Sequence, residues 1–216
     1  MRAISVTVGP LATASANAIC LSQTPSAGLL TINGALASGG VATLDTPRRV
    51  LITTTANESS RTFTITGTNW SGQAISEVIT GPNISTGQSV LDYATVTSIR
   101  ISGNAAGALT VGTNGVASSP WVHLDEWALP TVAIQCNATG TVNYTVQQTL
   151  DSPNSTTAST SVSTMNWLNH SDSNLVNATS TVQGTYTAAP VFARVLLNSG
   201  TGSVTARFAQ SGVVGL

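Results

Sequence analysis

The sequence predicts an all-β protein made of antiparallel sheets, and three observations predict it. Strong helix formers are sparse, and no long segment keeps apolar residues at i, i+3 and i+4 without an intervening Gly or Pro. β-Branched residues are abundant, with 34 Thr in the chain, and such residues favour strands. Short alternating segments recur between clusters of Gly, Asn, Pro and Ser, which is the spacing of a sandwich or barrel.

Fifteen strands are expected, separated by one turn-rich stretch at Gly112 to Pro120 (GTNGVASSP). Nine precede this stretch: Arg2 to Val8, Ala18 to Ser22, Leu29 to Asn33, Val41 to Leu44, Arg49 to Thr55, Arg61 to Thr68, Gln73 to Thr80, Thr95 to Ser102 and Ala108 to Val111. Six follow it: Thr131 to Cys136, Thr141 to Leu150, Ser161 to Trp167, Ser180 to Tyr186, Val191 to Asn198 and Ser203 to Gln210. We therefore expect two jelly-roll or immunoglobulin-like sandwiches in tandem, residues 1–117 and 118–216, because sandwiches of about 100 residues are common.

Two hairpins carry the clearest pattern. In RTFTITGTNWSGQAISEVITGP, Phe63 and Ile65 share one face of a strand while threonines share the other face, because successive strand residues point to opposite sides. The turn Asn69 to Gly72 supplies a glycine for a left-handed backbone position. A second hairpin is expected where Ser199 to Gly202 joins ARVLLN to SVTARF.

The charge pattern excludes two classes of partner. Only 7% of the residues are charged, and seven arginines and eight acids give a net charge of -1. The basic surface of a nucleic-acid-binding protein is therefore missing, and no apolar run approaches the roughly 18 residues of a membrane helix. The basic residues are all arginine, which suits planar contacts at interfaces, although codon bias explains the same composition.

No metal or cofactor is expected. Cys20 and Cys136 lie far apart and in no CxxC arrangement, so buried free thiols are predicted, with a Cys20 to Cys136 bridge as the alternative. His123 and Asp125 would lie on one strand face and could share a metal. Two ligands do not make a site, however.

No enzymatic activity is expected either. Asp151, His170 and Asp172 can be combined with one of 26 serines as a hydrolase triad, but no GxSxG motif accompanies them. Chance proximity is the simpler explanation. An enzyme would need a pocket that brings His123 or His170 beside carboxylates.

Five residues are the candidates for contacts with a protein partner. Arg48 and Arg49 are adjacent at the start of a strand and are expected to anchor a neighbour from opposite faces, with two solvated arginines as the alternative. Trp70 lies at a hairpin tip, where an aromatic ring is expected to reach a subunit interface or a sugar. Trp121 and Trp127 flank His123-x-Asp125-Glu126, and the alternative for them is packing in a segment that links the two halves.

Several strings resemble small virion proteins of tailed bacteriophages, which are found among head, decoration and head-to-tail proteins. The strings are PRRVLIT (Pro47 to Thr53), TFTITGTNWSGQAISEVITGPN (Thr62 to Asn83), DYATVTSIRISG (Asp92 to Gly103), VGTNGVASSPW (Val111 to Trp121) and GTVNYTVQQTLD (Gly140 to Asp151). The resemblance covers most of the chain and consists of structural rather than catalytic motifs. It implies an all-β accessory protein that assembles on the particle without enzymatic activity.

The expected function is therefore that of a structural virion protein, either a capsid decoration or cement protein or a head-to-tail or tail accessory protein. Its partners would be major capsid or head-to-tail and tail subunits, and it would form a homo-oligomer. The expected location is the virion, after assembly in the host cytoplasm. The alternative is a host-binding or glycan-binding sandwich module of a fibre or surface adhesin.

Overall fold

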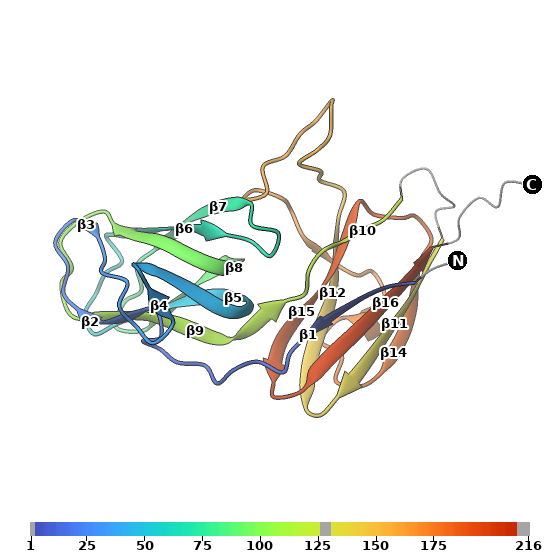
Figure 1. Cartoon of the computed structure of the whole chain (residues 1–216), viewed down its shortest axis with the longest axis horizontal. Helices are drawn as coiled ribbons and strands as arrows, with labels where there is room; N and C mark the ends of the chain where they lie inside the picture. The colour runs from blue at the N-terminus through green and yellow to red at the C-terminus, as the bar shows by residue number, and fades with distance from the viewer. Residues whose placement is uncertain (1–2, 126–130, 211–216) are drawn as a thin grey trace, which may run out of the picture. The chain divides into compact units, whose positions relative to one another are not determined.

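A computed structural model describes residues 3–125 and 131–210. The regular secondary structure of the described chain is nearly all strand and its sheets are antiparallel, so the predicted all-β class is confirmed (Figure 1). One short 3-10 turn, η1 (Ser173–Leu175), is the only helical element among the described residues.

Contacts within the chain group the residues into two compact units. Unit 1 combines Met1–Leu11 with Val116–Leu216, and unit 2 is Ala12–Gly115. This grouping differs from the expected division at residue 117 because the first strand belongs with the C-terminal half. Strand β1 (Ile4–Val8) pairs antiparallel with β16 (Ser203–Gln210), which places Ile4 opposite Phe208. In sequence, unit 2 is thus an insertion between two parts of unit 1.

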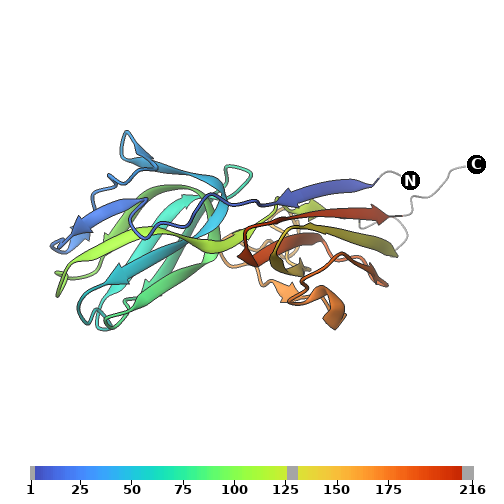
Figure 2. The same ribbon diagram turned by 90° about the horizontal axis from the view of Figure 1, so that it is seen from below.

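Unit 1 is a sandwich of two sheets. One sheet has the order β1-β16-β11-β14, and the strands can be followed side by side in Figures 1 and 2. The other contains β13, β12 and β15, with β10 and the end of β9 paired to β15. The strand bounds are β9 Leu109–Ser118, β10 Val122–His123, β11 Val132–Thr139, β12 Val142–Thr149, β13 Leu168–Asn169, β14 Val182–Tyr186 and β15 Phe192–Gly200.

The core of unit 1 lies between these sheets. It includes Ile134 and Phe208 from one sheet and Val146 and Val195 from the other, each at most 2% exposed. At about 1.5 to 3 kcal/mol for each large apolar side chain, this burial is the main stabilising contribution.

The predicted hairpin between the last two strands is wrong. β15 and β16 follow each other in sequence, but β15 pairs with β12 while β16 pairs with β11 and β1. Both strands carry an apolar face, formed by residues such as Val195 and Ala206, which are 0% exposed. A flat hairpin would place these faces side by side in one sheet, whereas a chain that crosses from sheet to sheet lets them cover each other.

Unit 2 is built around two long strands. β5 (Val41–Thr54) and β8 (Thr86–Ile101) pair antiparallel, with register shifts near Arg48 and Leu51. The sheet order is β9-β5-β8-β6-β7, and the short strands β2 (Cys20–Gln23), β3 (Gly28–Leu29) and β4 (Ala37–Ser38) pair with β9, β8 and β5.

The hairpin predicted for Arg61 to Pro82 is confirmed. β6 (Thr62–Thr68) and β7 (Ala74–Thr80) pair in register from Thr62 opposite Thr80 to Thr68 opposite Ala74. Phe63 and Ile65 are both 0% exposed, and the Tyr93 hydroxyl donates to the Ile65 carbonyl at 3.2 Å. The threonine face points outward, as the alternation predicts.

Four other predicted strands need correction. Val41 to Leu44 and Arg49 to Thr55 are parts of the single strand β5, which passes through Asp-Thr-Pro with an irregular register. β8 begins nine residues before the expected Thr95, because its first half pairs with β5. Ser161 to Trp167 forms turns and irregular chain instead of a strand, and only Leu168–Asn169 pairs with β12.

The cysteines are free and buried, as expected. Cys20 belongs to β2 of unit 2 and Cys136 to β11 of unit 1, and each is 0% exposed. Burial raises the pKa of Cys20 to about 12 and that of Cys136 to about 11. The alternative of a bridge between them is therefore wrong for this structure.

We expect neither thiol to react with iodoacetamide in the folded protein at about pH 8, because the thiolate is the nucleophile and burial suppresses it. Both should react after unfolding in urea, and mass spectrometry after a short exposure counts the adducts. Rapid alkylation of either cysteine in the folded protein would contradict this burial.

Candidate functional site

Arg48, the first predicted anchor, is buried within unit 2. It is 1% exposed, and its Nη1 donates to the Ala12 carbonyl and to Asp45 Oδ1, both at 3.0 Å. Its Nη2 donates to the Asn114 carbonyl. The guanidinium therefore fastens the first residues of unit 2 to its last residues, and the expectation of a surface anchor at Arg48 is corrected. Its neighbour Arg49 is only partly exposed, with Nε 3.8 Å from Asp92 Oδ1.

Trp70 remains a candidate for partner contact. It is 39% exposed at the tip of the β6–β7 hairpin. Asn69 Oδ1 accepts hydrogen bonds from the backbone N–H groups of Ser71 and Gln73, each at 3.0 Å, and Gly72 has φ +80°. These bonds fix the backbone of the turn, so binding through Trp70 would cost little conformational entropy of the backbone. Trp127, another candidate from the sequence, lies outside the described residues.

Trp121 belongs to an aromatic cluster on the outer face of the sheet that contains β12 and β15. Its ring centroid lies 5.1 Å from that of Trp167 and 5.8 Å from that of Phe192, and the Arg194 guanidinium stacks 4.2 Å above Trp167. Arg194 Nε also donates to Gln147 Oε1 at 3.0 Å. Since Phe192 and Arg194 are 9% and 5% exposed, the cluster mainly covers β15 and β12. Trp121 therefore packs against its own chain, as the alternative to partner contact predicts, and it does so within unit 1.

A different surface of unit 1 is almost uncharged. It is the outer face of the sheet β1-β16-β11-β14 (Figure 2). By the alternation of buried and exposed positions, its outward residues are Ser5, Thr7, Ser203, Thr205, Arg207, Ala209, Ala133, Gln135, Asn137, Thr139, Gln183 and Thr185. We call this surface the neutral face, because Arg207 is the one charged residue among these twelve.

Arg207 lies in the middle of the neutral face. The register places Ser5, Arg207, Gln135 and Gln183 opposite one another across the four strands. Arg207 is exposed and forms no ion pair with any described carboxylate. Beside this row is a shallow hollow of about 480 Å³, whose lining includes Ala133 and Ala209. The guanidinium of Arg207 and the side-chain amides of Gln135 and Gln183 are thus placed where a partner surface could contact them.

The sequence carried a signal for Arg207 that our prediction of contact residues did not use. In SVTARFAQ, Val204, Ala206 and Phe208 alternate as inward residues, and they are at most 1% exposed. The same alternation places Arg207 on the outside. The prediction named Arg48 and Arg49 because arginine is enriched at interfaces and the two are adjacent. Their strand has an irregular register, so alternation does not show which side each one faces.

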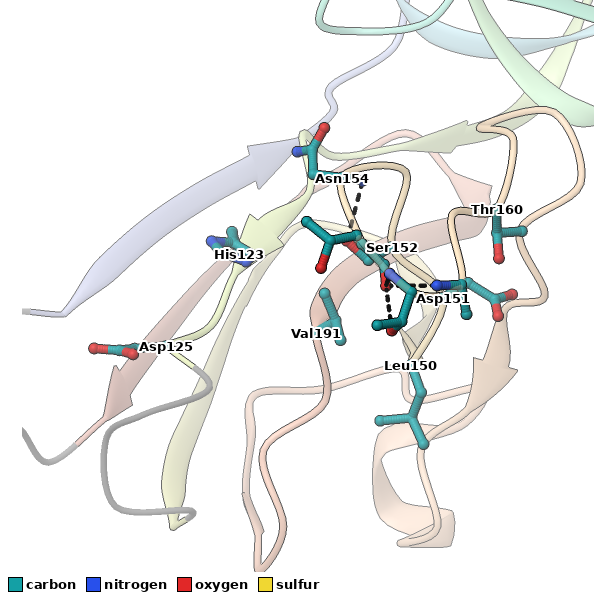
Figure 3. A pocket seen from close by; sticks show the side chains of 12 residues that line it. His123, Asp125, Leu150, Asp151, Ser152, Asn154, Thr160 and Val191 are labelled. Atoms are coloured by element: carbon teal, nitrogen blue, oxygen red, sulfur yellow. Dashed lines mark hydrogen bonds between the residues drawn. The ribbon is translucent and has the colours of Figure 1, made fainter.

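A pocket of about 770 Å³ in unit 1 brings His123 together with two carboxylates, Asp125 and Asp151 (Figure 3). Most of its remaining lining comes from the hydroxyl-rich loop 152–160. An enzyme would need such a pocket. However, the Asp151 carboxylate accepts the Asn166 N–H at 2.6 Å and so holds the loop, and the Asp125 side chain points away from Asp151.

The pocket does not assemble a triad from these parts. His123 makes no side-chain hydrogen bond to a described residue, whereas a nucleophile and its base must lie within hydrogen-bond reach. Instead the His123 ring packs on Phe192, with centroids 5.0 Å apart. Residues 3–125 and 131–210 contain no group of three His, Cys, Asp or Glu side chains able to hold a metal ion.

No described helix has the length and apolar character needed to cross a membrane. Comparison with protein-family models and with curated proteins finds no match to this sequence. The resemblance to virion proteins thus stays a prediction from the sequence strings.

Proposed function

We propose that this chain is a non-enzymatic structural protein of a tailed-bacteriophage virion, acting by static binding to neighbouring capsid, head-to-tail or tail subunits. The observation that carries the proposal is the neutral face with Arg207 at its centre. Protein interfaces are depleted in Lys, Glu and Asp at their core and enriched in Arg, and Arg is among the residue types that dominate binding energy.

The size of the neutral face shows that it would not act alone. Four strands about 4.8 Å apart and about 20 Å long cover on the order of 400 Å². A stable interface takes about 800 Å² from each partner. Further contacts are therefore needed. In unit 2, the exposed Trp70 at the β6–β7 tip is a separate candidate for contact with a neighbouring subunit.

A sheet edge with little charge supports the same proposal. β7 is the last strand of its sheet path, and Glu77 is its only charged residue. The Glu77 carboxylate is turned to the backbone N–H groups of Val90 and Leu91, at 2.8 and 2.9 Å, while Val78 on this strand is 62% exposed. Monomeric proteins usually place charged residues on such edge strands, which prevents aggregation. An edge strand with little charge is therefore typical of a subunit whose edges are covered by neighbouring subunits.

Purified particles from lysates of the phage that encodes this chain provide the test. Mass spectrometry should find its peptides in a constant ratio to the major capsid protein after density-gradient purification. Infectious particles that contain none of its peptides would overturn the proposal.

A further inference from the structure

We infer that unit 1 has a second binding site, a small polar pocket for a neutral hydroxyl-bearing ligand about the size of one sugar ring. The pocket has a volume of about 350 Å³ and is lined by residues that include Gln148, His170, Asp172 and Tyr186. This inference does not depend on the proposed virion function.

The fold brings these residues together from three elements. Gln148 lies on β12 and Tyr186 ends β14. The His170 backbone N–H donates to the Val146 carbonyl at 2.9 Å, which fixes the segment before η1 beside β12. Gly184 lets η1 approach β14, because a Cβ at this position would lie 2.4 Å from Leu175 Cδ1.

Three polar atoms of this lining are buried without a hydrogen-bond partner. They are Gln148 Oε1, His170 Nε2 and the Tyr186 hydroxyl, although the His170 ring also interacts with the Thr185 backbone, which opposes the lowering of its pKa by burial. His170 and Tyr186 are only 3% and 5% exposed, and their rings pack with centroids 4.6 Å apart. A buried polar group left unpaired costs about 1 to 3 kcal/mol, so such groups are rare and call for an explanation. Three in the lining of one pocket indicate that a ligand completes them, after a small shift of the side chains that cover these atoms.

The protonation state of each group can be assigned. His170 Nδ1 accepts the Asp172 N–H at 2.9 Å, so in the neutral ring the proton is on Nε2, which becomes a donor. Burial lowers the pKa of His170, against the opposing effect of the Asp172 carboxylate, and keeps the ring neutral near pH 7. Burial also raises the pKa of Tyr186, which therefore keeps its hydroxyl proton.

This set of groups selects the class of ligand. Gln148 Oε1 accepts, His170 Nε2–H donates, and the Tyr186 hydroxyl does either. An anion would face the Gln148 oxygen and the Asp172 carboxylate, and a cation would face the His170 N–H. Hydroxyl groups match all three, because each hydroxyl both donates and accepts. The volume is roughly ten times the ~30 Å³ share of one water molecule, which leaves room for a ring with several hydroxyls.

The probes for the test are glucose, galactose, mannose and N-acetylglucosamine, each titrated to about 100 mM into the full chain and followed by protein-observed NMR. A Kd of this order corresponds to weak binding. At least one sugar is expected to shift the signals of the pocket residues. Magnesium ions and inorganic phosphate at the same concentrations are expected to leave these signals unchanged.

Tyr186→Phe is the decisive variant, since it removes only the hydroxyl. It is expected to weaken sugar binding about five-fold or more, the equivalent of one lost hydrogen bond. Because this hydroxyl is unpartnered in the folded chain, the melting temperature should stay the same or rise. Gln148→Leu removes a second unpaired atom and should also weaken binding.

Tyr144→Phe is the matched control in the same core. The Tyr144 hydroxyl donates to the Ser180 carbonyl at 2.8 Å and does not line the pocket. This variant should bind sugar as the wild type does but melt at a lower temperature. The inference is overturned if no sugar shifts the pocket signals, if phosphate or magnesium does so instead, or if Tyr186→Phe binds as tightly as the wild type. It is also overturned if Tyr186→Phe lowers the melting temperature as Tyr144→Phe does.

Discussion

Replacing Arg48 with alanine is expected to lower the free energy of unfolding of unit 2 by about 1.5 to 3 kcal/mol, the usual contribution of hydrogen bonds made by a charged group. The substitution leaves the Ala12 and Asn114 carbonyls without their guanidinium donor and Asp45 without its ion pair. Arg48→Lys should restore little of the lost free energy, because a single ammonium group cannot reproduce the arrangement of N–H donors on the planar guanidinium. Urea denaturation followed through amide signals of unit 2 measures the effect.

Arg100→Ala is the matched control for this prediction. Arg100 is an exposed arginine of the same unit, on β8, and pairs with no described carboxylate. Its removal should change the free energy of unfolding by less than about 0.5 kcal/mol. Equal losses in the two variants would contradict the assignment of Arg48 as the fastening residue of unit 2.

The interaction between Arg48 and Asp45 makes the stability of unit 2 depend on pH. Burial by itself would raise the pKa of Asp45, but hydrogen bonds from the Ala12 N–H and from Arg48 outweigh it and hold the pKa below the ordinary 3.8. With the folded-state pKa lowered, Asp45 stabilises the fold above about pH 3.8, and this contribution is lost as the pH falls through the folded-state pKa. The difference in urea midpoint between wild type and Arg48→Ala should therefore narrow between pH 7 and about pH 3.

Arg207→Glu is expected to reduce the number of copies incorporated per virion at least ten-fold, which corresponds to about 1.4 kcal/mol or more of lost binding. If the neutral face is the interface we propose, reversing its only charge places a carboxylate opposite groups suited to a guanidinium, and mismatched charges at an interface are costly. Stability should change little, because Arg207 is exposed. Virions grown with each variant are compared by quantitative mass spectrometry.

Arg100→Glu makes the same charge change on unit 2 and should be incorporated normally. Normal incorporation of Arg207→Glu would show that the neutral face is not an interface. A loss shared by both variants would point to net charge rather than to this face.

The sequence predicted the parts of the fold that depend on local pattern. Alternation fixed which side of β6 is buried, and the Asn-Trp-Ser-Gly turn fixed its partner β7. Both signals lie within 20 residues of each other, so no long-range information was needed. The free state of Cys20 and Cys136 followed from composition in the same way.

The errors arose where pairing is long-range. A β15–β16 hairpin and a crossing between sheets have the same local sequence, and only the positions of β11 and β12 decide between them. The placement of β1 beside β16 joins residues about 200 positions apart. Alternation identifies the faces of a strand but not its neighbours.

The candidate sites differ in the same way: local sequence pattern predicts some of their features, and long-range contacts determine the others. Outward placement of Arg207 can be derived from its strand, whereas burial of Arg48 depends on carbonyls of Ala12 and Asn114, far away in sequence. The pocket at Gln148, His170 and Tyr186 joins three distant segments and had no local signature. His170 was weighed as part of a triad, but its Nδ1 accepts a backbone N–H of the adjacent turn.

A cryo-electron-microscopy reconstruction of purified particles tests the central claim most directly. Our account predicts ordered copies of this chain in which the neutral face, with Arg207 at its centre, is buried against a neighbouring subunit. Particles that lack the chain, or that carry it with the neutral face open to solvent, would contradict it.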